Sequence, residues 1–159
     1  MNWGRCSTST FAKADWTFDA MSKAIDKGLA CAERSGSTST WVMSNHDVPR
    51  HATRYALPQV PTSEYHQIAN DWLLRDGTTY IEDRQAGALR ARAALMLEMA
   101  LPGSAYVYQG EELGMTNVQY DIEDYKDCEI INMYHERLEK GYSKDEIMKS
   151  IYAKGRDNA

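Results

Sequence analysis

The stretch TWVMSNHDVPRHATRY, residues 40–55, runs from a short apolar segment directly into polar and charged side chains. Residues 40–44 are rich in β-branched and aromatic side chains, which favours a short buried strand. Asn45, His46 and Asp47 follow where this strand would end, and Arg54 lies in the loop beyond them. In parallel α/β architectures ligands bind at the carboxyl ends of the strands, so this position is a candidate site.

A second apolar segment, SAYVY at residues 104–108, repeats the arrangement and is followed by QGEE. The sequence before it, RQAGALRARAALMLEMAL at residues 84–101, predicts a helix that the following Pro-Gly pair terminates. Another helix is predicted over residues 16–34, before the first strand, and Gly36 is placed to end it. Helices alternating with two apolar strands predict parallel βα units and therefore an α/β fold.

Apolar residues recur at helical spacing in both helices and predict which faces enter the core. The stripe in the helix over residues 16–34 comprises Phe18, Met21, Ile25, Leu29 and Ala32. The predicted core face of the helix over residues 84–101 comprises Leu89, Ala93, Met96, Leu97 and Ala100. The Met-rich segment 94–99 is accordingly interpreted as core packing.

The C-terminal part is more polar and predicts two further helices. Residues 125–141, YKDCEIINMYHERLEKG, predict an amphipathic helix that ends at Gly141. Ser143 and Glu146 match the Ser-x-x-Glu capping box, which opens a helix. A short helix is also predicted within residues 63–74, between the two strand segments.

The composition and net charge of the chain indicate which kinds of binding partner and cellular environment to expect. With 159 residues, of which 43% are hydrophobic and 26% charged, the chain is long and apolar enough for a globular domain. The formal charge of −5 argues against nucleic acid, which is bound by clustered Lys and Arg. The sequence contains no run of about 18 apolar residues, so we predict no membrane-spanning helix. Three widely spaced cysteines match neither a disulfide framework nor a zinc site, so we expect reduced thiols and a cytoplasmic protein.

The polar groups after the first strand have the chemistry of a hydroxyl-binding site. Asp47 offers two acceptor oxygens to a pair of sugar hydroxyls, and His46 can donate to another. Arg54 supplies a planar fork of donors. The alternative interpretation is that Asn45 and Asp47 form an Asx turn as the chain leaves the strand, with His46 a satisfied neighbour.

Other sites are less well supported. Glu111 and Glu112 are adjacent, so at most one can point into a site while the other serves a salt bridge or a helix start. A metal site from His46, Asp47 and His51 lacks a recurring ligand spacing, and we predict no metal. No glycine-rich turn follows a strand, so we predict no nucleotide cofactor either.

Taken together, these segments resemble the end of the catalytic barrel of glycoside hydrolase family 13, the α-amylase family, in its α-glucosidase and oligo-1,6-glucosidase branch. SNHDVPR resembles the segment after the seventh barrel strand, and LPGSAYVYQGEELGM resembles the eighth strand and its exit. GYSKDEIMKSIYAKGRDNA is similar to an insert of oligo-1,6-glucosidases. The resemblance implies a partial (β/α)8 TIM barrel over residues 1–114 and a helical insert over residues 115–159.

The resemblance also implies roles for three side chains. Asp47 matches the family's third catalytic carboxylate, which stabilises the transition state. His46 matches a histidine that binds the same sugar, and Arg54 matches an arginine of the glucose pocket. The implied reaction is hydrolysis of α-1,4 or α-1,6 glucosides with retention of configuration.

The same comparison implies that two catalytic groups lie outside this chain. The family's nucleophilic Asp and acid/base Glu follow its fourth and fifth strands, and the resemblance begins near the sixth unit. We therefore expect a fragment that is inactive alone and associates through exposed barrel edges; the alternative is a non-catalytic sugar-binding or interaction remnant.

Overall fold

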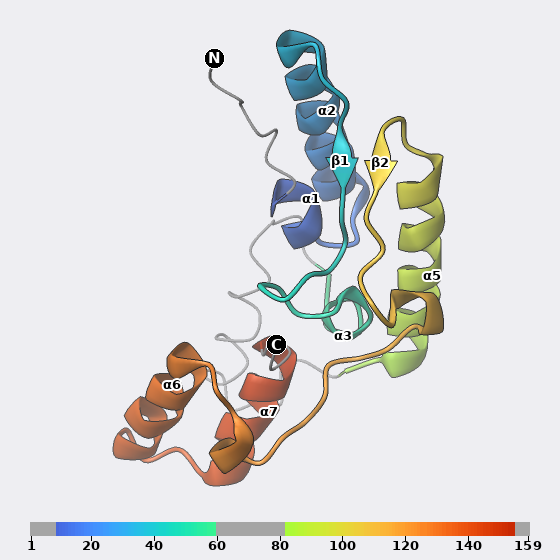
Figure 1. Cartoon of the computed structure of the whole chain (residues 1–159). Coiled ribbons are helices and arrows are strands. Elements are labelled where there is room, and N and C mark those ends of the chain that lie inside the picture. Colours follow the sequence, from blue (N-terminus) through green and yellow to red (C-terminus); the bar gives the residue numbers. More distant parts are fainter. Residues whose placement is uncertain (1–8, 60–81, 155–159) are drawn as a thin grey trace.

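A computed structural model describes residues 9–59 and 82–154 of the chain, and the helix predicted within residues 63–74 lies outside them. Two short strands, β1 (Thr40–Trp41) and β2 (Ser104–Ala105), lie side by side between the long helices α2 (Phe18–Ser35) and α5 (Arg84–Ala100) (Figure 1). The short helix α1 (Ser9–Lys13) precedes α2, and α3 (His51–Arg54) lies near the end of the strand layer. None of the helices in these ranges is long and apolar enough to cross a membrane.

The strands pair in parallel, with Thr40 opposite Ser104 and Trp41 opposite Ala105, as the helix–strand alternation predicts. Only the first two residues of each predicted strand form the ladder. The first segment is buried through Met43 and Ser44, but residues 104–107 are exposed, so the prediction of a second buried strand is wrong. Among the described residues β2 pairs with β1 alone, so its other edge has no strand partner there.

The crossover into β2 depends on a close backbone approach. Gly103 has φ 126°, and a Cβ at this position would collide with the carbonyl oxygen of Ser39. The indole nitrogen of Trp41 donates to the Pro102 carbonyl oxygen at 2.9 Å. The Pro-Gly pair thus ends α5 and also brings the next strand against β1.

Helix α2 begins and ends as its sequence predicts. The Thr17 side chain accepts a hydrogen bond from the Ala20 amide at 3.3 Å, and Gly36 ends the helix with φ 64°. Met21 and Ala32 are buried on the core side, whereas Phe18 is 86% exposed. The predicted stripe is therefore correct except at its first residue, where the helix extends beyond the core.

Helix α5 turns a different face to the core from the one predicted. Its buried residues are Gly87, Ala91, Ala94 and Glu98, while Leu89 and Met96 are 59% and 74% exposed. A Cβ on Gly87 would lie 2.7 Å from the Ala56 Cβ, so small residues permit α5 to approach the segment after α3. The interpretation of segment 94–99 as core packing is wrong for Met96 and Met99, which are both exposed.

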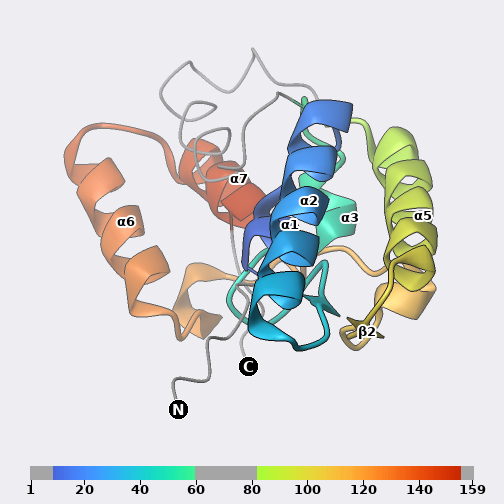
Figure 2. The same ribbon diagram turned by 90° about the horizontal axis from the view of Figure 1, so that it is seen from above.

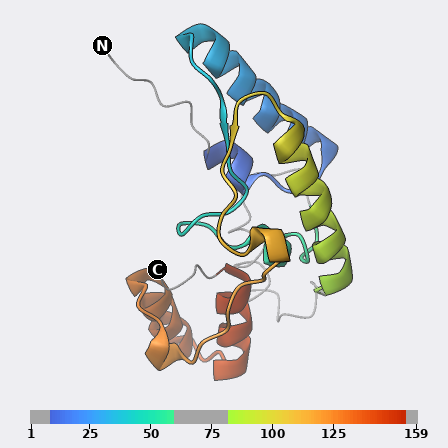
Figure 3. The same cartoon turned by 45° about the vertical axis from the view of Figure 1, so that its right-hand side comes forward.

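The C-terminal helices form a second apolar cluster. Helices α6 (Cys128–Glu139) and α7 (Lys144–Lys154) follow two 3-10 turns, η1 (Glu111–Leu113) and η2 (Ile122–Asp124). They lie beyond the strand layer, at the end where α3 lies (Figure 3). Their shared core contains Tyr125, Ile130, Met133, Tyr134, Ile147, Met148 and Ile151.

The predicted end of α6 before Gly141 and the capping box at the start of α7 are confirmed, whereas α6 begins at Cys128 and not at residue 125. Gly141 follows α6 with φ 88°. The Ser143 amide donates to Glu146 Oε2 at 2.8 Å, and the Glu146 amide donates to Ser143 Oγ at 3.4 Å, which are the two bonds of a capping box.

Seen from above, α6 and α5 lie on opposite sides of α2 (Figure 2).

The cysteines differ from the expectation of reduced thiols. Cys31, on α2, is disulfide-bonded, so the expectation is wrong for this residue. Cys128, at the start of α6, is free and exposed.

Candidate functional site

The turn after the first strand segment presents His46 and Asp47 to solvent. Their side chains are 65% and 66% exposed, and His46 Nε2 lies 3.4 Å from Asp47 Oδ1. The Asp47 amide donates to Asn45 Oδ1 at 2.8 Å, and Asn45 forms an isolated antiparallel bridge with Val48. The chain therefore makes the Asx turn of the alternative interpretation, and this turn leaves the His46 and Asp47 side chains accessible.

Arg54 lies in a different environment from His46 and Asp47. It is 1% exposed, at the end of α3. Its guanidinium donates to the carbonyl oxygens of Ala12 and, at 3.3 Å, of Met43, and lies 4.8 Å from the Tyr55 ring centroid. These contacts connect the N-terminal segment to the first strand segment. The structure thus buries Arg54 and exposes the other two predicted residues.

Directly beneath the turn, Ser44, His51 and Glu111 form a buried polar cluster. Ser44 Oγ lies 2.9 Å from His51 Nδ1 and accepts the His51 backbone amide at 3.0 Å. Glu111 Oε1 lies 3.2 Å from the same nitrogen, and both ionisable side chains are at most 3% exposed. In a hydrolytic triad the serine and the acid contact opposite nitrogens of the histidine. Here both contact Nδ1, so the cluster joins segments rather than activating the serine.

The two adjacent glutamates fold back onto their own turn. Glu111 Oε2 accepts the Tyr108 amide at 2.8 Å, and Glu112 Oε2 accepts the Gly110 amide at 2.9 Å. Glu111 is buried and Glu112 is exposed. Only Glu111 therefore points inward, in agreement with the expectation that at most one of them does so.

Glu98 is a second buried carboxyl group that sequence reasoning missed. It is fully buried on the inner face of α5, and its Oε1 accepts the Tyr106 amide at 3.2 Å. Burial, together with the negative charge of Glu111, raises the pKa of Glu98 to about 7. The available signal was its spacing from Gly87, Ala91 and Ala94, which places a glutamate on a stripe of small residues.

Burial also acts on the tyrosine next to Arg54. Burial raises the pKa of Tyr55 to about 12, with the nearby Arg54 guanidinium opposing the shift. The Tyr55 ring packs edge-on against His51 at 5.7 Å between centroids. The interior behind the turn is thus a connected set of neutral and charged polar groups.

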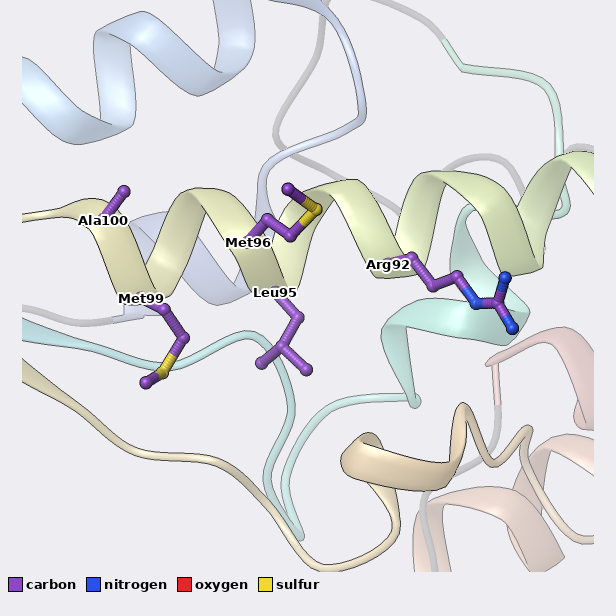
Figure 4. A pocket seen from close by; sticks show the side chains of 5 residues that line it. All are labelled: Arg92, Leu95, Met96, Met99 and Ala100. Carbon is purple, nitrogen blue, oxygen red and sulfur yellow. The ribbon is translucent and has the colours of Figure 1, made fainter.

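A groove lies elsewhere, on the surface of helix α5. It has a volume of about 690 Å³ and runs along α5, lined by Arg92, Leu95, Met96, Met99 and Ala100 (Figure 4). Its lining is mainly apolar and lacks the hydroxyl-binding groups of the turn. Among the described residues no three His, Cys, Asp or Glu side chains gather as metal ligands.

Comparison with known proteins identifies the family. The sequence-family model for the alpha-amylase catalytic domain matches residues 5–159 of the chain. The chain belongs to the alpha-amylase family. Its resemblance to glycoside hydrolase family 13, carried by the Asn-His-Asp and Gln-Gly-Glu-Glu segments, is thereby confirmed.

Curated relatives of the chain include an oligo-1,6-glucosidase and a palatinase. The chain is 36% identical to the oligo-1,6-glucosidase of Parageobacillus thermoglucosidasius over 91% of its own length and 21% of the relative's. It is 36% identical to the palatinase of Erwinia rhapontici over 85% of its length and 20% of the relative's. The chain therefore spans about a fifth of the length of the curated relatives it matches.

The fold also matches solved structures of this family. Trehalose-6-phosphate hydrolase from Bacillus licheniformis superposes with a TM-score of 0.58 and 29% identity, over 94% of this chain and 24% of that enzyme. The structural neighbours of this alpha-amylase family chain are TIM-barrel enzymes. Its own described part is mostly helical, with one short parallel strand pair.

Proposed function

We propose that the chain forms the last βα units of a TIM-barrel catalytic domain, residues 1–114, and a helical insert, residues 115–159. The catalytic domain is that of an α-glucosidase that releases terminal α-1,4- or α-1,6-linked glucose from short oligosaccharides, with retention. The observation that supports this most directly is the exposed His46–Asp47 pair on the turn that follows a parallel strand segment.

In this proposal Asp47 stabilises the transition state. Its two oxygens accept hydrogen bonds from adjacent hydroxyls of the glucose ring, and these bonds strengthen as the ring flattens toward an oxocarbenium ion. His46, 3.4 Å from Asp47 Oδ1, donates to a neighbouring hydroxyl. The Asx turn orients both groups before the sugar binds, because Asn45 holds the Asp47 amide.

Retaining hydrolysis requires two further carboxyl groups, a nucleophile that attacks the anomeric carbon and an acid that protonates the leaving oxygen. Glu98 and Glu111 are buried and accept the Tyr106 and Tyr108 amides, so we assign neither role to them. We propose that both groups belong to the part of the relatives' catalytic domain that this chain does not match. The 159-residue chain should then bind sugar weakly without hydrolysing it.

Arg54 is proposed to act from beneath the glucose site. Its hydrogen bonds to the Ala12 and Met43 carbonyl oxygens hold the floor of the pocket together. A direct contact between Arg54 and glucose remains a prediction from the family resemblance.

An isomaltose titration of the ¹⁵N-labelled chain tests this function. We expect amide shifts that concentrate at His46 and Asp47, with millimolar affinity that Asp47→Asn weakens several-fold. Asp145→Asn, at an exposed aspartate in the first turn of α7, is the matched control and should leave the affinity unchanged. Shifts that are absent, or that are unaffected by Asp47→Asn, would contradict the proposed site.

Hydrolysis is measured separately with p-nitrophenyl α-glucoside. We expect no release of p-nitrophenol above the buffer rate from the purified chain. Turnover that Asp47→Asn abolishes would show that this chain supplies its own nucleophile and acid.

A further inference from the structure

Asn117 makes three hydrogen bonds to two separate parts of the molecule. Its backbone amide donates to Thr53 Oγ1 at 2.7 Å, and its side-chain Oδ1 accepts the Arg50 amide at 2.8 Å. Its Nδ2 donates to the Tyr152 carbonyl oxygen in α7 at 2.8 Å. With 6% exposure, Asn117 is shielded from water, so each of these bonds replaces hydration that the buried groups have lost.

The first two bonds hold α3 and the residue before it. One contacts Thr53 within α3, and the other contacts Arg50, which lies three residues beyond Asp47. Arg50 is the residue at the N-terminal cap of α3 and has no side-chain cap of its own. Its guanidinium donates to the Gln109 carbonyl oxygen at 2.6 Å and lies 5.1 Å from the Tyr108 ring centroid. Arg50 is therefore held on its backbone by Asn117 and on its side chain by the exit of β2.

Little chain separates this anchor from the turn. Val48 is buried and bridged to Asn45, and the proline ring of Pro49 restricts φ just before Arg50. A displacement of the Arg50 backbone is consequently transmitted to Asp47, because the two intervening residues have little freedom to absorb it. The His46 and Asp47 side chains are mostly exposed, so the backbone from which they project is held by buried neighbours such as Arg50.

The third hydrogen bond of Asn117 connects it to helix α7. Tyr152 belongs to α7, which is packed against α6 through the buried residues Ile147 and Ile151. The Asn117 carboxamide thus bridges the C-terminal helix pair and the segment that precedes α3.

We propose that Asn117 is a positioning residue for Asp47, holding the Arg50 backbone against helix α7 so that the carboxylate keeps its place on the turn. The proposal rests on the proposed function of Asp47 in sugar binding. It gives the helical C-terminal part a specific role at the sugar site.

Amide hydrogen exchange of the full ¹⁵N-labelled chain tests the positioning directly. Asn117→Ala should speed exchange of the Arg50 and Asp47 amides about tenfold, the effect of one lost buried hydrogen bond, while the Ala94 amide in α5 stays within about threefold. Asn132→Ala, an exposed asparagine on α6, is the matched control and should change none of them. Unchanged exchange at Arg50, or equal acceleration at Arg50 and Ala94, would overturn the proposal.

Asn117→Asp provides a second variant that keeps the acceptor for the Arg50 amide but loses the Nδ2 donor to the Tyr152 carbonyl oxygen, so it separates the local bond to Arg50 from the bond to α7. Arg50 protection should then stay within about threefold of the wild-type value, because the Arg50 hydrogen bond is retained. Exchange as fast as in Asn117→Ala would show that the acceptor does not hold Arg50 and would also overturn the proposal.

Isomaltose titration of the same variants connects position to binding. Asn117→Ala should weaken isomaltose binding several-fold relative to Asn132→Ala, and binding equal to the control would contradict a role in positioning Asp47. If the wild-type chain bound no isomaltose, the proposed function would fail, while the exchange experiment would still decide whether Asn117 holds the turn.

Discussion

The exposed turn and the buried cluster behind it contain similar residue types in opposite environments. On the turn, a histidine and an aspartate are about two-thirds exposed and contact each other. Beneath it, His51 and Glu111 are almost completely buried at nearly the same separation, 3.2 Å, and share Ser44. Similar side chains therefore differ in environment: the exposed pair is accessible to solvent, and the buried pair joins α3 to the exit of β2.

The largest expected effect belongs to Asp47 in a complete catalytic domain. A chimera in which residues 1–159 replace the matching segment of the Parageobacillus oligo-1,6-glucosidase should be an active enzyme. Asp47→Asn should lower its kcat/KM by about 10²–10³-fold, the usual loss when one transition-state interaction is removed. The melting temperature should not change, because the side chain is mostly exposed. A comparable loss from Asp145→Asn would remove the distinction between the turn and other surface carboxylates.

The buried pair should affect stability instead. Glu111→Ala leaves the Tyr108 amide and the buried His51 without their acceptor, at a cost of about 3 kcal/mol in unfolding free energy. The adjacent Glu112→Ala removes one part-buried hydrogen bond from the Gly110 amide to an exposed side chain and should cost less than about 1 kcal/mol. Urea unfolding of both variants measures the difference, and equal costs would refute the contrast drawn here.

Glu98 should make the stability of the interior depend on pH. Because its folded pKa is raised to about 7 from 4.5, the folded state retains a proton that the unfolded chain releases at lower pH. Its stabilisation is complete below about pH 4.5 and is lost as pH rises through about 7. Glu98→Gln should reduce the difference in unfolding free energy between pH 5 and pH 8, whereas Glu139→Gln, at an exposed site on α6, should retain it.

The exposed apolar face of α5 should produce a smaller, concentration-dependent effect. Met96 and Met99 are 74% and 64% exposed on α5, and among the described residues β2 has one unpaired edge, so two copies of the chain are expected to associate through these surfaces. Met96→Lys with Met99→Lys should shift sedimentation toward the monomer at a given concentration. A wild-type chain that sediments as a monomer at all concentrations would contradict this association.

The accuracy of the sequence predictions varied with the distance over which each feature is stabilised. Gly36, Gly141 and the Ser143–Glu146 capping box were read correctly, because a helix end is stabilised by residues within one turn of it. The buried face of α5 was read incorrectly, because hydrophobicity favoured Leu89 and Met96 while close packing required Gly87 and Ala91.

At the candidate site the same division applies. His46 and Asp47 were proposed as site residues because they follow a predicted strand, and their place on an exposed turn depends on neighbours in sequence. Glu98 was missed, and the contact between His51 and Glu111 was not foreseen, because these residues come from α5, α3 and the exit of β2 and meet only when the segments pack together.

The sequence alone therefore determined the glycine and capping-box signals at the helix ends, the parallel order of the two units and the polar turn after the first strand, since each depends on local hydrogen bonding and on apolar periodicity. Only the tertiary structure decided which face of α5 is buried, which carboxyl groups lose their water, and that Asn117 connects α7 to the segment after Asp47. The physical reason is that desolvation and close packing depend on residues distant in the chain, and these become neighbours only in the folded molecule.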